Sequence, residues 1–314
     1  MNARSLYVGI DVGSVSVNVV VLDEKRCVLE EQYLRHRGQP MRVAAEALRD
    51  VAARYGRDNI PLLAATGSGG RVVAGIMGGH FVNEVVAQGA AAAALYPHTR
   101  TIVEIGGEDS KLIFLKQGPN GLEVADFAMN TICAAGTGSF LDQQASRLGV
   151  SIEEFGELAL KSQHPPRVAG RCSVFAKSDM IHLQQQATPV HDIIAGLCYA
   201  LARNFKSTVG SSAPIEPPVA FHGGVAANVG IVKAMRDVLE LDEEEFFIPE
   251  HFAAMGAIGA VIHVLETGAD TKQPAWSRLD DLYSYTVQRE KRPLPPLKLE
   301  KSVIMPAEVC RPEV

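Results

Sequence analysis

Two short stretches of the sequence pair a carboxylate with a glycine turn. Asp11 precedes V-G-S-V-S and Glu104 precedes I-G-G-E-D-S, and apolar, strand-like runs flank both stretches. The glycines of these turns, Gly13, Gly106 and Gly107, let backbone N–H groups approach an anion closely. Two such turns facing each other could hold the phosphates of one nucleotide, with the carboxylates binding Mg²⁺ directly or through water. Each turn by itself is more typical of an ordinary β-hairpin, whereas the two together favour the phosphate site.

A third glycine turn follows another apolar run. The stretch V-A-F-H-G-G-V-A-A-N-V-G, residues 219–230, leads through Gly223 and Gly224 into a predicted helix. A bare glycine backbone could accept the flat base or the ribose of a nucleotide, although a simple strand-to-helix turn looks the same. The stretch T-G-S-G-G-R at 66–71 lacks the third glycine and the ribose-binding acid of a dinucleotide fingerprint, so we expect no Rossmann site there.

Two cysteines lie in polar, glycine-flanked settings. Cys133 precedes A-A-G-T-G-S-F-L-D, and Cys172 stands in G-R-C-S-V-F-A. Ser139 and Asp142 are spaced like a capping box, which predicts a helix whose free N–H groups point toward the Cys133 thiolate. Arg171 adds positive potential beside Cys172, which favours its thiolate. The alternative for both cysteines is burial as small apolar side chains.

The composition indicates a globular protein and excludes several classes of partner. With 314 residues, 47% of them hydrophobic, the chain can bury a large core and is long enough for two domains. Its net charge of −6 provides no positive field for nucleic acid or for anionic lipid, and we expect neither partner. No signal core or long apolar run is seen, so we expect a cytoplasmic protein. Five cysteines without C-x-x-C spacing do not suit a disulfide framework or a zinc site, and we assign no ligand role to Cys27, Cys198 or Cys310.

The elements that must position these residues alternate between strands and helices. The apolar patterns predict strands at residues 6–10 and 17–22, helices at 41–55 and 83–95, and a second strand pair across 101–115. That second pair repeats the order of the first: apolar strand, acid, glycine turn, apolar strand. An internal repeat of this kind indicates duplicated domains.

The domain boundaries follow from this repeat. We place the first domain at residues 1–97 and the second at 98–266, and the helix at about 253–266 is a candidate to pack back on the first domain. From Thr267 onward the prolines predict an irregular segment, a linker or a surface arm, over residues 267–314.

The order of the motifs resembles the actin-like ATPase fold of acetate and sugar kinases, heat-shock chaperones and actin. That resemblance implies an α/β fold of two duplicated domains with a nucleotide cleft between them. The segments G-I-D-V-G-S, I-G-G-E-D-S-K, C-A-A-G-T-G-S-F-L, C-S-V-F-A-K-S-D and H-G-G-V-A-A-N, with M-G-A-I-G-A at 255–260, narrow it to one family. Together they look like the ATP-dependent activators of 2-hydroxyacyl-CoA dehydratases and the related ATPase subunits of benzoyl-CoA reductases.

The resemblance implies roles for individual residues. The residues expected to act in catalysis are Asp11, Glu84, Glu104 and Glu108. The residues expected to bind ATP or ADP are Gly13, Ser14, Ser16, Gly106, Gly107, Asp109, Lys111, Gly136, Gly138, Gly223, Gly224 and Asn228. Glu84 equally suits a helix-start carboxylate stabilised by the helix dipole, and Lys111 an exposed strand lysine.

The resemblance also implies a homodimer that shares one 4Fe-4S cluster, bound by Cys133 and Cys172 of each subunit. Such a cluster needs four thiolates, and two chains related by a twofold axis would supply them. The cluster would receive an electron from reduced ferredoxin or flavodoxin, and ATP hydrolysis would drive transfer to an acceptor iron–sulfur dehydratase or reductase. Two alternatives share the fold: a small-molecule kinase acting on a sugar or a carboxylate, and a nucleotide-dependent assembly or chaperone-like module.

Two features depart from the family pattern. The second turn reads E-I-G-G-E-D, where the family usually has D-I-G-G-Q-D. Glu108 would bring a negative charge near the phosphates and could slow hydrolysis, with Lys111 as a partial offset. The proline-rich end suggests a resemblance to the activator segment of a longer fused protein.

Overall fold

The computed structural model describes residues 5–119, 121–130, 134–170, 172–210, 214–269 and 273–285. The strands are β1 (Tyr7–Val12), β2 (Ser16–Leu22), β3 (Val28–Arg35), β4 (Leu62–Thr66), β5 (His80–Phe81), β6 (Thr101–Ile105), β7 (Ser110–Gly118), β8 (Gly121–Asn130), β9 (Val219–His222) and β10 (Phe246–Phe247). The α-helices are α1 (Pro40–Tyr55), α2 (Gly70–Met77), α3 (Glu84–Leu95), α4 (Gly138–Leu148), α5 (Ile152–Ala159), α6 (Ser173–Gln185), α7 (Val190–Thr208), α8 (Val229–Leu239), α9 (Met255–Glu266) and α10 (Leu279–Tyr283). The short 3-10 helices are η1 (Arg57–Asn59), η2 (Ala134–Gly136), η3 (Gly224–Ala227) and η4 (Trp276–Arg278).

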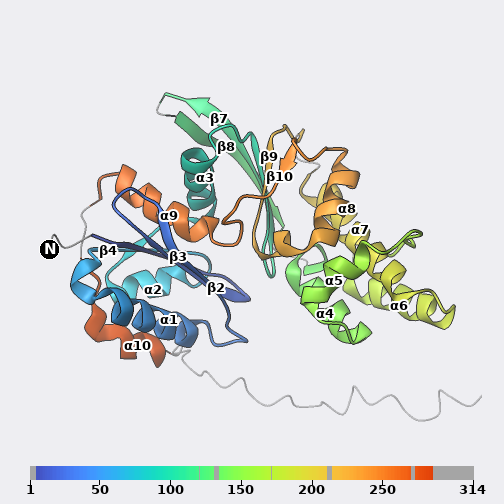
Figure 1. Cartoon of the computed structure of the whole chain (residues 1–314), viewed down its shortest axis with the longest axis horizontal. Coiled ribbons are helices and arrows are strands. Elements are labelled where there is room, and N and C mark those ends of the chain that lie inside the picture. Colours follow the sequence, from blue (N-terminus) through green and yellow to red (C-terminus); the bar gives the residue numbers. More distant parts are fainter. Residues whose placement is uncertain are drawn as a thin grey trace, which may run out of the picture.

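Two sheets with the same internal topology form the framework (Figure 1). The first has the order β3-β2-β1-β4-β5, and the second has the order β8-β7-β6-β9-β10. In each, the first three strands pair antiparallel and the last two run parallel to the central strand. The duplication expected from the sequence repeat is therefore confirmed, as is the α/β fold. We call the two units the first and the second domain.

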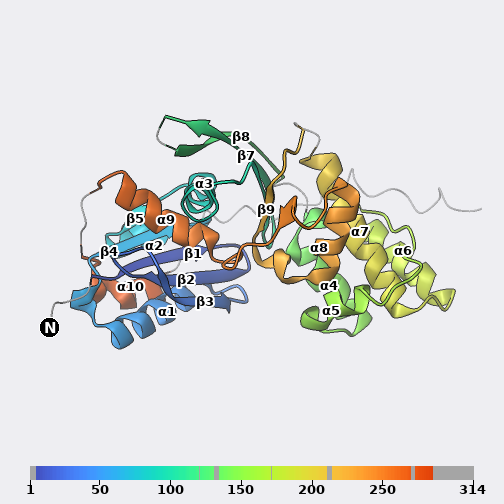
Figure 2. The same cartoon turned by 45° about the horizontal axis from the view of Figure 1, so that its top comes forward.

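Helices cover both faces of the first sheet (Figure 2). The side chains of Val8 and Ile10 pack with α1, α2 and α10, whereas Val20 and Leu22 pack with α9. Helix α9 follows the second sheet in the sequence yet lies on the first, so the chain crosses between the domains a second time. Its approach to α3 requires a glycine, because a Cβ on Gly259 would lie 1.7 Å from the Ala87 carbonyl oxygen.

The second sheet has its main core on the side away from α3. Side chains of α4, α5, α7 and α8 pack there around buried aromatic residues such as Phe140, Phe205 and Phe221. Helix α3 covers the other face and lies between the two domains (Figure 1). Within the described ranges, no helix is both long and apolar enough to cross a lipid bilayer.

The segment Trp276–Tyr283 is helical, so the expectation of an irregular chain from Thr267 onward is wrong for this part. Trp276, Leu279 and Leu282 are buried in the core of the first domain beside α1 and α2. Three apolar side chains spaced three residues apart present one helical face, and burying that face stabilises a helix too short to form alone.

Replacing Leu282 with alanine should lower the free energy of unfolding by roughly 2–4 kcal/mol, because a fully buried leucine leaves a cavity when truncated. Urea unfolding measures this loss. Asp281→Ala is the matched control, since the Asp281 side chain is 62% exposed and its removal should cost less than about 0.5 kcal/mol. Equal stability of both variants would show that this segment does not belong to the core.

Candidate functional site

A cleft of about 690 Å³ lies between the two domains and receives side chains from both. Its volume is in the range of sites for small molecules and cofactors. The sequence-predicted site residues that line it are Asp11, Gly13, Ser14, Ser16, Glu84, Glu104, Gly106, Gly107, Glu108, Asp109, Lys111, Gly138, Gly223, Gly224 and Asn228. The structure thus brings all three glycine turns to one place.

The first turn, residues 11–16, connects β1 to β2. The Gly13 N–H donates to the Ser16 carbonyl at 2.9 Å, which closes the turn. Asp11 sits at its start between two glycines that leave room for its carboxylate. A Cβ on Gly67 would lie 2.3 Å from Asp11 Oδ1, and a Cβ on Gly256 would lie 2.5 Å from Oδ2. Gly67, in the T-G-S-G-G-R stretch, therefore leaves the space that the Asp11 carboxylate occupies.

The second turn, residues 104–110, connects β6 to β7 and is tied to helix α4. The Gly106 N–H donates to the Asp109 carbonyl at 3.0 Å. The N–H groups of Gly138 and Ser139 donate to the carbonyls of Gly106 and Gly107 at 2.9 and 2.8 Å. The first turn of α4 thus supports the second turn of the cleft.

The capping box predicted at Ser139 is wrong. Helix α4 begins at Gly138 after Thr137, which makes no side-chain cap, and Ser139 already lies inside the helix. The Asp142 carboxylate binds the Arg35 guanidinium instead of a helix N–H. Since the Ser139 N–H is already used by the second turn, it is not free for a thiolate.

Lys111 is the centre of a buried charge cluster, so its interpretation as an exposed strand lysine is wrong. Its side chain is 3% exposed, and Nζ lies 2.7 Å from Glu104 Oε2, 2.8 Å from Asp109 Oδ2 and 3.6 Å from Glu84 Oε2. Burial lowers the pKa of Lys111, but the attraction of Glu104 and Asp109 outweighs it and the pKa is raised. The ammonium therefore stays charged and binds these carboxylates rather than offsetting Glu108, which is exposed in the cleft.

The pKa values of Asp11 and Glu104, the acids at the start of the first and second turns, are both raised. Burial raises the pKa of Asp11 from 3.8 to about 7, with repulsion from Glu84 as the second cause. Burial also raises the pKa of Glu104 from 4.5 to about 7, against the opposing attraction of Lys111. With Glu84 and Asp109 close by, these two carboxyl groups share one ammonium, that of Lys111, so a bound cation would stabilise their ionised forms.

These carboxylates do not form a complete metal cage. No group of three or more histidine, cysteine or acidic side chains within the described ranges is arranged as a metal centre. Mg²⁺ usually takes one or two carboxylates, with water and substrate phosphates completing its shell. Asp11 and Glu104 are a suitable donor set of that limited kind.

The third turn, residues 222–228, forms the far wall of the cleft. Gly223 has a φ of +90°, and a Cβ there would lie 2.4 Å from the Ile105 carbonyl oxygen. Asn228 caps α8, with Oδ1 accepting from the Ile231 N–H at 3.0 Å. Its Nδ2 is buried without a hydrogen-bond partner among the described atoms.

The remaining predicted residues lie elsewhere. Gly136 does not line the cleft, and a Cβ there would lie 2.9 Å from Asn204 Nδ2. Cys133 is outside the described residues. Cys172 is half-buried at the N-cap position of α6, with no side-chain cap hydrogen bond, and does not line the cleft.

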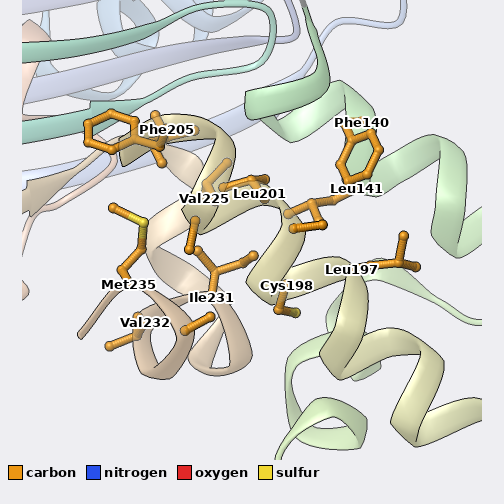
Figure 3. Packing of buried hydrophobic residues seen from close by; sticks show 14 of the residues in the cluster. Phe140, Leu141, Leu197, Cys198, Leu201, Phe205, Val225, Ile231, Val232 and Met235 are labelled. Atoms are coloured by element: carbon orange, nitrogen blue, oxygen red, sulfur yellow. The ribbon is translucent and has the colours of Figure 1, made fainter. Parts of the chain in front are cut away.

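The other two described cysteines do not resemble ligands. Cys27 is exposed. Cys198 lies among Leu197, Leu201 and other core side chains of the second domain (Figure 3). Burial there raises the pKa of the Cys198 thiol to about 12. Cys310 is outside the described residues.

Sequence reasoning missed several residues of the cleft. Tyr33 and Arg35 line it from β3, and Gln88 lines it from α3. Gln88 Oε1 lies 2.7 Å from His222 Nδ1, which links α3 to the third turn. A residue of this kind leaves no local pattern, because its role depends on an element far away in the chain.

Comparison with known families yields one match over most of the chain. The BadF/BadG/BcrA/BcrD ATPase family matches residues 8–263. The (R)-2-hydroxyglutaryl-CoA dehydratase activating ATPase of Acidaminococcus fermentans is 31% identical over 257 residues, which cover 81% of this chain and 96% of that protein. The 2-hydroxyisocaproyl-CoA dehydratase activator of Clostridioides difficile is 36% identical over 180 residues, which cover 57% of this chain and 65% of the activator.

Solved structures agree with this similarity. Component A of the A. fermentans (R)-2-hydroxyglutaryl-CoA dehydratase superposes with a TM-score of 0.77 at 28% identity, over 85% of this chain and all of that one. The activator of the 2-hydroxyisocaproyl-CoA dehydratase of Clostridium difficile, solved with bound ADPNP, gives 0.74 at 28% identity over 84% and 95%. An ethanolamine utilization protein, EutJ of Carboxydothermus hydrogenoformans, shares the fold at 18% identity, with a TM-score of 0.52 over 82% and 89% of the two chains.

Proposed function

The chain belongs to the BadF/BadG/BcrA/BcrD ATPase family, and from this we propose that it is an ATP-dependent activator of a partner enzyme. The partner would be an iron–sulfur enzyme of the 2-hydroxyacyl-CoA dehydratase or benzoyl-CoA reductase type. The activator would couple ATP hydrolysis to the transfer of one electron, received from reduced ferredoxin or flavodoxin. The names of the relatives support the activator role.

The observation that carries the ATPase half of this proposal is the convergence of three glycine turns on one cleft. Turns 11–16 and 104–110 would hold the phosphates through backbone N–H groups other than those of Gly13 and Gly106, which close the turns themselves. Gly223, Gly224 and Asn228 would contact the adenosine. Asp11 and Glu104 would hold Mg²⁺ and orient the attacking water, and Mg²⁺ would neutralise charge developing on the phosphates.

Glu84 and Glu108 differ in how well they suit a catalytic role. Glu84 is the first residue of α3, next to the Asn83 cap, and it lies 3.6 Å from Lys111 in the charge cluster. Glu84 therefore lies both at the start of a helix and in the cleft, so its position agrees with both expectations. Glu108 lines the cleft and is exposed, so its carboxylate would lie near the phosphates of a bound nucleotide.

The surroundings of Cys172 support the electron-transfer half. Its side chain lies at the N-cap position of α6 and makes no cap hydrogen bond, so the sulfur is not committed to the helix. Val174 and Phe175 lie two and three residues after Cys172 and are 66% and 65% exposed, an unusual degree for large apolar side chains. A second copy of the chain packed there would cover them and bring its own Cys172 near. With Cys133 of each subunit, four thiolates would bind one 4Fe-4S cluster, which supplies one-electron chemistry at low potential.

Replacing Cys172 with serine tests this proposal. We expect the variant, purified without oxygen, to lose the iron–sulfur absorbance near about 400 nm and the dimer, while ATP binding is kept because Cys172 does not line the cleft. Iron content, size-exclusion chromatography and nucleotide binding measure the three properties. Cys27→Ser is the control, since Cys27 is exposed and does not line the cleft. A colourless unmodified protein with intact thiols would contradict the electron-transfer role and leave a kinase or an assembly module.

A further inference from the structure

Strand β3 turns one face toward the second domain. Glu31, Tyr33 and Arg35 alternate along the strand, so their side chains share a face. All three line the cleft, although β3 is an edge strand of the first sheet. No motif of the sequence pointed to this strand.

Arg35 makes the first contact across the cleft. Its guanidinium binds the Asp142 carboxylate on α4 through two hydrogen bonds, Nη1 to Oδ1 at 3.3 Å and Nη2 to Oδ2. The side chains are 40% and 31% exposed. Because the start of α4 also binds the carbonyls of Gly106 and Gly107, this ion pair connects β3 to the second turn.

Glu31 makes the second contact. Its Oε2 lies 2.7 Å from His251 Nδ1 in the loop before α9. The same loop is attached to the third turn, since the Gly223 N–H donates to the Phe252 carbonyl at 2.8 Å. This contact therefore connects β3 to the wall opposite the first turn.

Tyr33 makes the third contact, between the other two. A Cβ on Gly224 would lie 3.1 Å from the Tyr33 hydroxyl oxygen and 3.3 Å from a ring carbon. The phenol thus rests against the glycine backbone of the third turn. A side chain at position 224 would push the ring, and with it β3, away from the second domain.

We propose that Glu31, Tyr33 and Arg35 form a clasp that closes the cleft over the nucleotide and limits the rate of its release. This proposal assumes that the cleft binds ATP, but it concerns the release of nucleotide and not hydrolysis or electron transfer. All three contacts join the first domain to parts of the second that carry the second and third turns. Separation of the domains, which nucleotide release requires, must break them together.

The polar contacts of the clasp are exposed, so each is individually weak. Its effect should therefore appear in exchange kinetics rather than in the stability of the fold. Salt screens exposed ion pairs, and higher ionic strength should speed nucleotide release from the unmodified chain.

Release of a fluorescent ADP analogue, chased with unlabelled ADP in a stopped-flow instrument, tests the clasp. Arg35→Glu places like charges opposite each other and should speed release roughly fivefold to tenfold. The double variant Arg35→Glu/Asp142→Arg restores opposite charges and should return the rate to within about twofold of the unmodified chain. Arg35→Met should make the rate less sensitive to salt.

Arg26→Glu is the matched control. Arg26 binds Glu266 at 2.9 Å, its side chain is 41% exposed, and it does not line the cleft. We expect its release rate to equal that of the unmodified chain. An unchanged rate in Arg35→Glu, or no recovery in the double variant, would overturn the clasp. Absence of an iron–sulfur cluster would contradict the electron-transfer role. It would not change the expected release rates, so the clasp can be tested independently.

Discussion

Replacing Asp11 with asparagine should lower the ATPase rate at least about a hundredfold and also stabilise the nucleotide-free protein at neutral pH. The rate falls because a neutral amide cannot hold Mg²⁺ or orient water as a carboxylate does. Binding of ATP should persist, because the turn N–H groups that would hold the phosphates are unchanged. Steady-state hydrolysis and equilibrium nucleotide binding separate the two effects.

The stabilisation should depend on pH in a defined direction. Burial raises the pKa of Asp11 from 3.8 to about 7, so the folded chain retains a proton that the unfolded chain releases between these values. The stability of the unmodified protein therefore decreases as the pH rises through this window. The Asp11→Asn variant has no such proton to lose. Its advantage should grow from near zero at about pH 4 to roughly 1–3 kcal/mol above about pH 7.

Thermal unfolding at several pH values, without nucleotide, measures this difference. Asp50→Asn is the control, because the Asp50 side chain is 59% exposed on α1 and pairs with a surface arginine, Arg54, in an i,i+4 contact. A constant difference between the Asp11→Asn variant and the unmodified chain at all pH values would contradict a raised pKa. Full ATPase activity in the variant would show that Asp11 has no catalytic role.

Replacing Lys111 with methionine should destabilise the fold by roughly 3–5 kcal/mol, the usual cost of removing one partner from a buried ion pair. Methionine keeps most of the volume of the side chain, so the loss reports on charge. Glu104, whose side chain is 9% exposed, would keep its place without the ammonium 2.7 Å away. Urea or thermal unfolding of the nucleotide-free protein measures the change.

A second substitution distinguishes charge from packing. Adding Glu104→Gln to Lys111→Met removes the carboxylate left without its partner and should recover more than half of the lost stability. Lys233→Met is the surface control, because Lys233 is 58% exposed and its pair with Asp237 should contribute less than about 0.5 kcal/mol. If the double variant is no more stable than Lys111→Met, the lysine acts through packing instead.

The local parts of the site could be predicted from the sequence. Gly13, Gly106 and Gly107 mark turns because glycine permits backbone positions that other residues avoid. The repeat of strand, acid and turn predicted the duplicated α/β fold, because the apolar pattern of a strand reflects its own burial. These signals lie within a few residues of each other, and the structure retains them.

Contacts between different elements could not be predicted from the sequence. Lys111 follows a turn on a strand and looks exposed there, but Glu104 of the paired strand β6, Asp109 of the turn and Glu84 of α3 surround it. Ser139 has the spacing of a cap, yet its N–H is taken by the Gly107 carbonyl. In both cases the partner that decides the outcome is remote in the chain or belongs to another element.

By itself, the sequence of this protein determined the positions of its glycine turns, its repeated strands and its family, since each depends on neighbouring residues. Only the tertiary structure decided that the turns share one cleft, that Lys111 is buried, that Trp276–Tyr283 joins the first domain and that β3 reaches across to the second. The physical reason is that burial and electrostatic pairing depend on which surfaces meet in space. A short window of sequence does not contain that information.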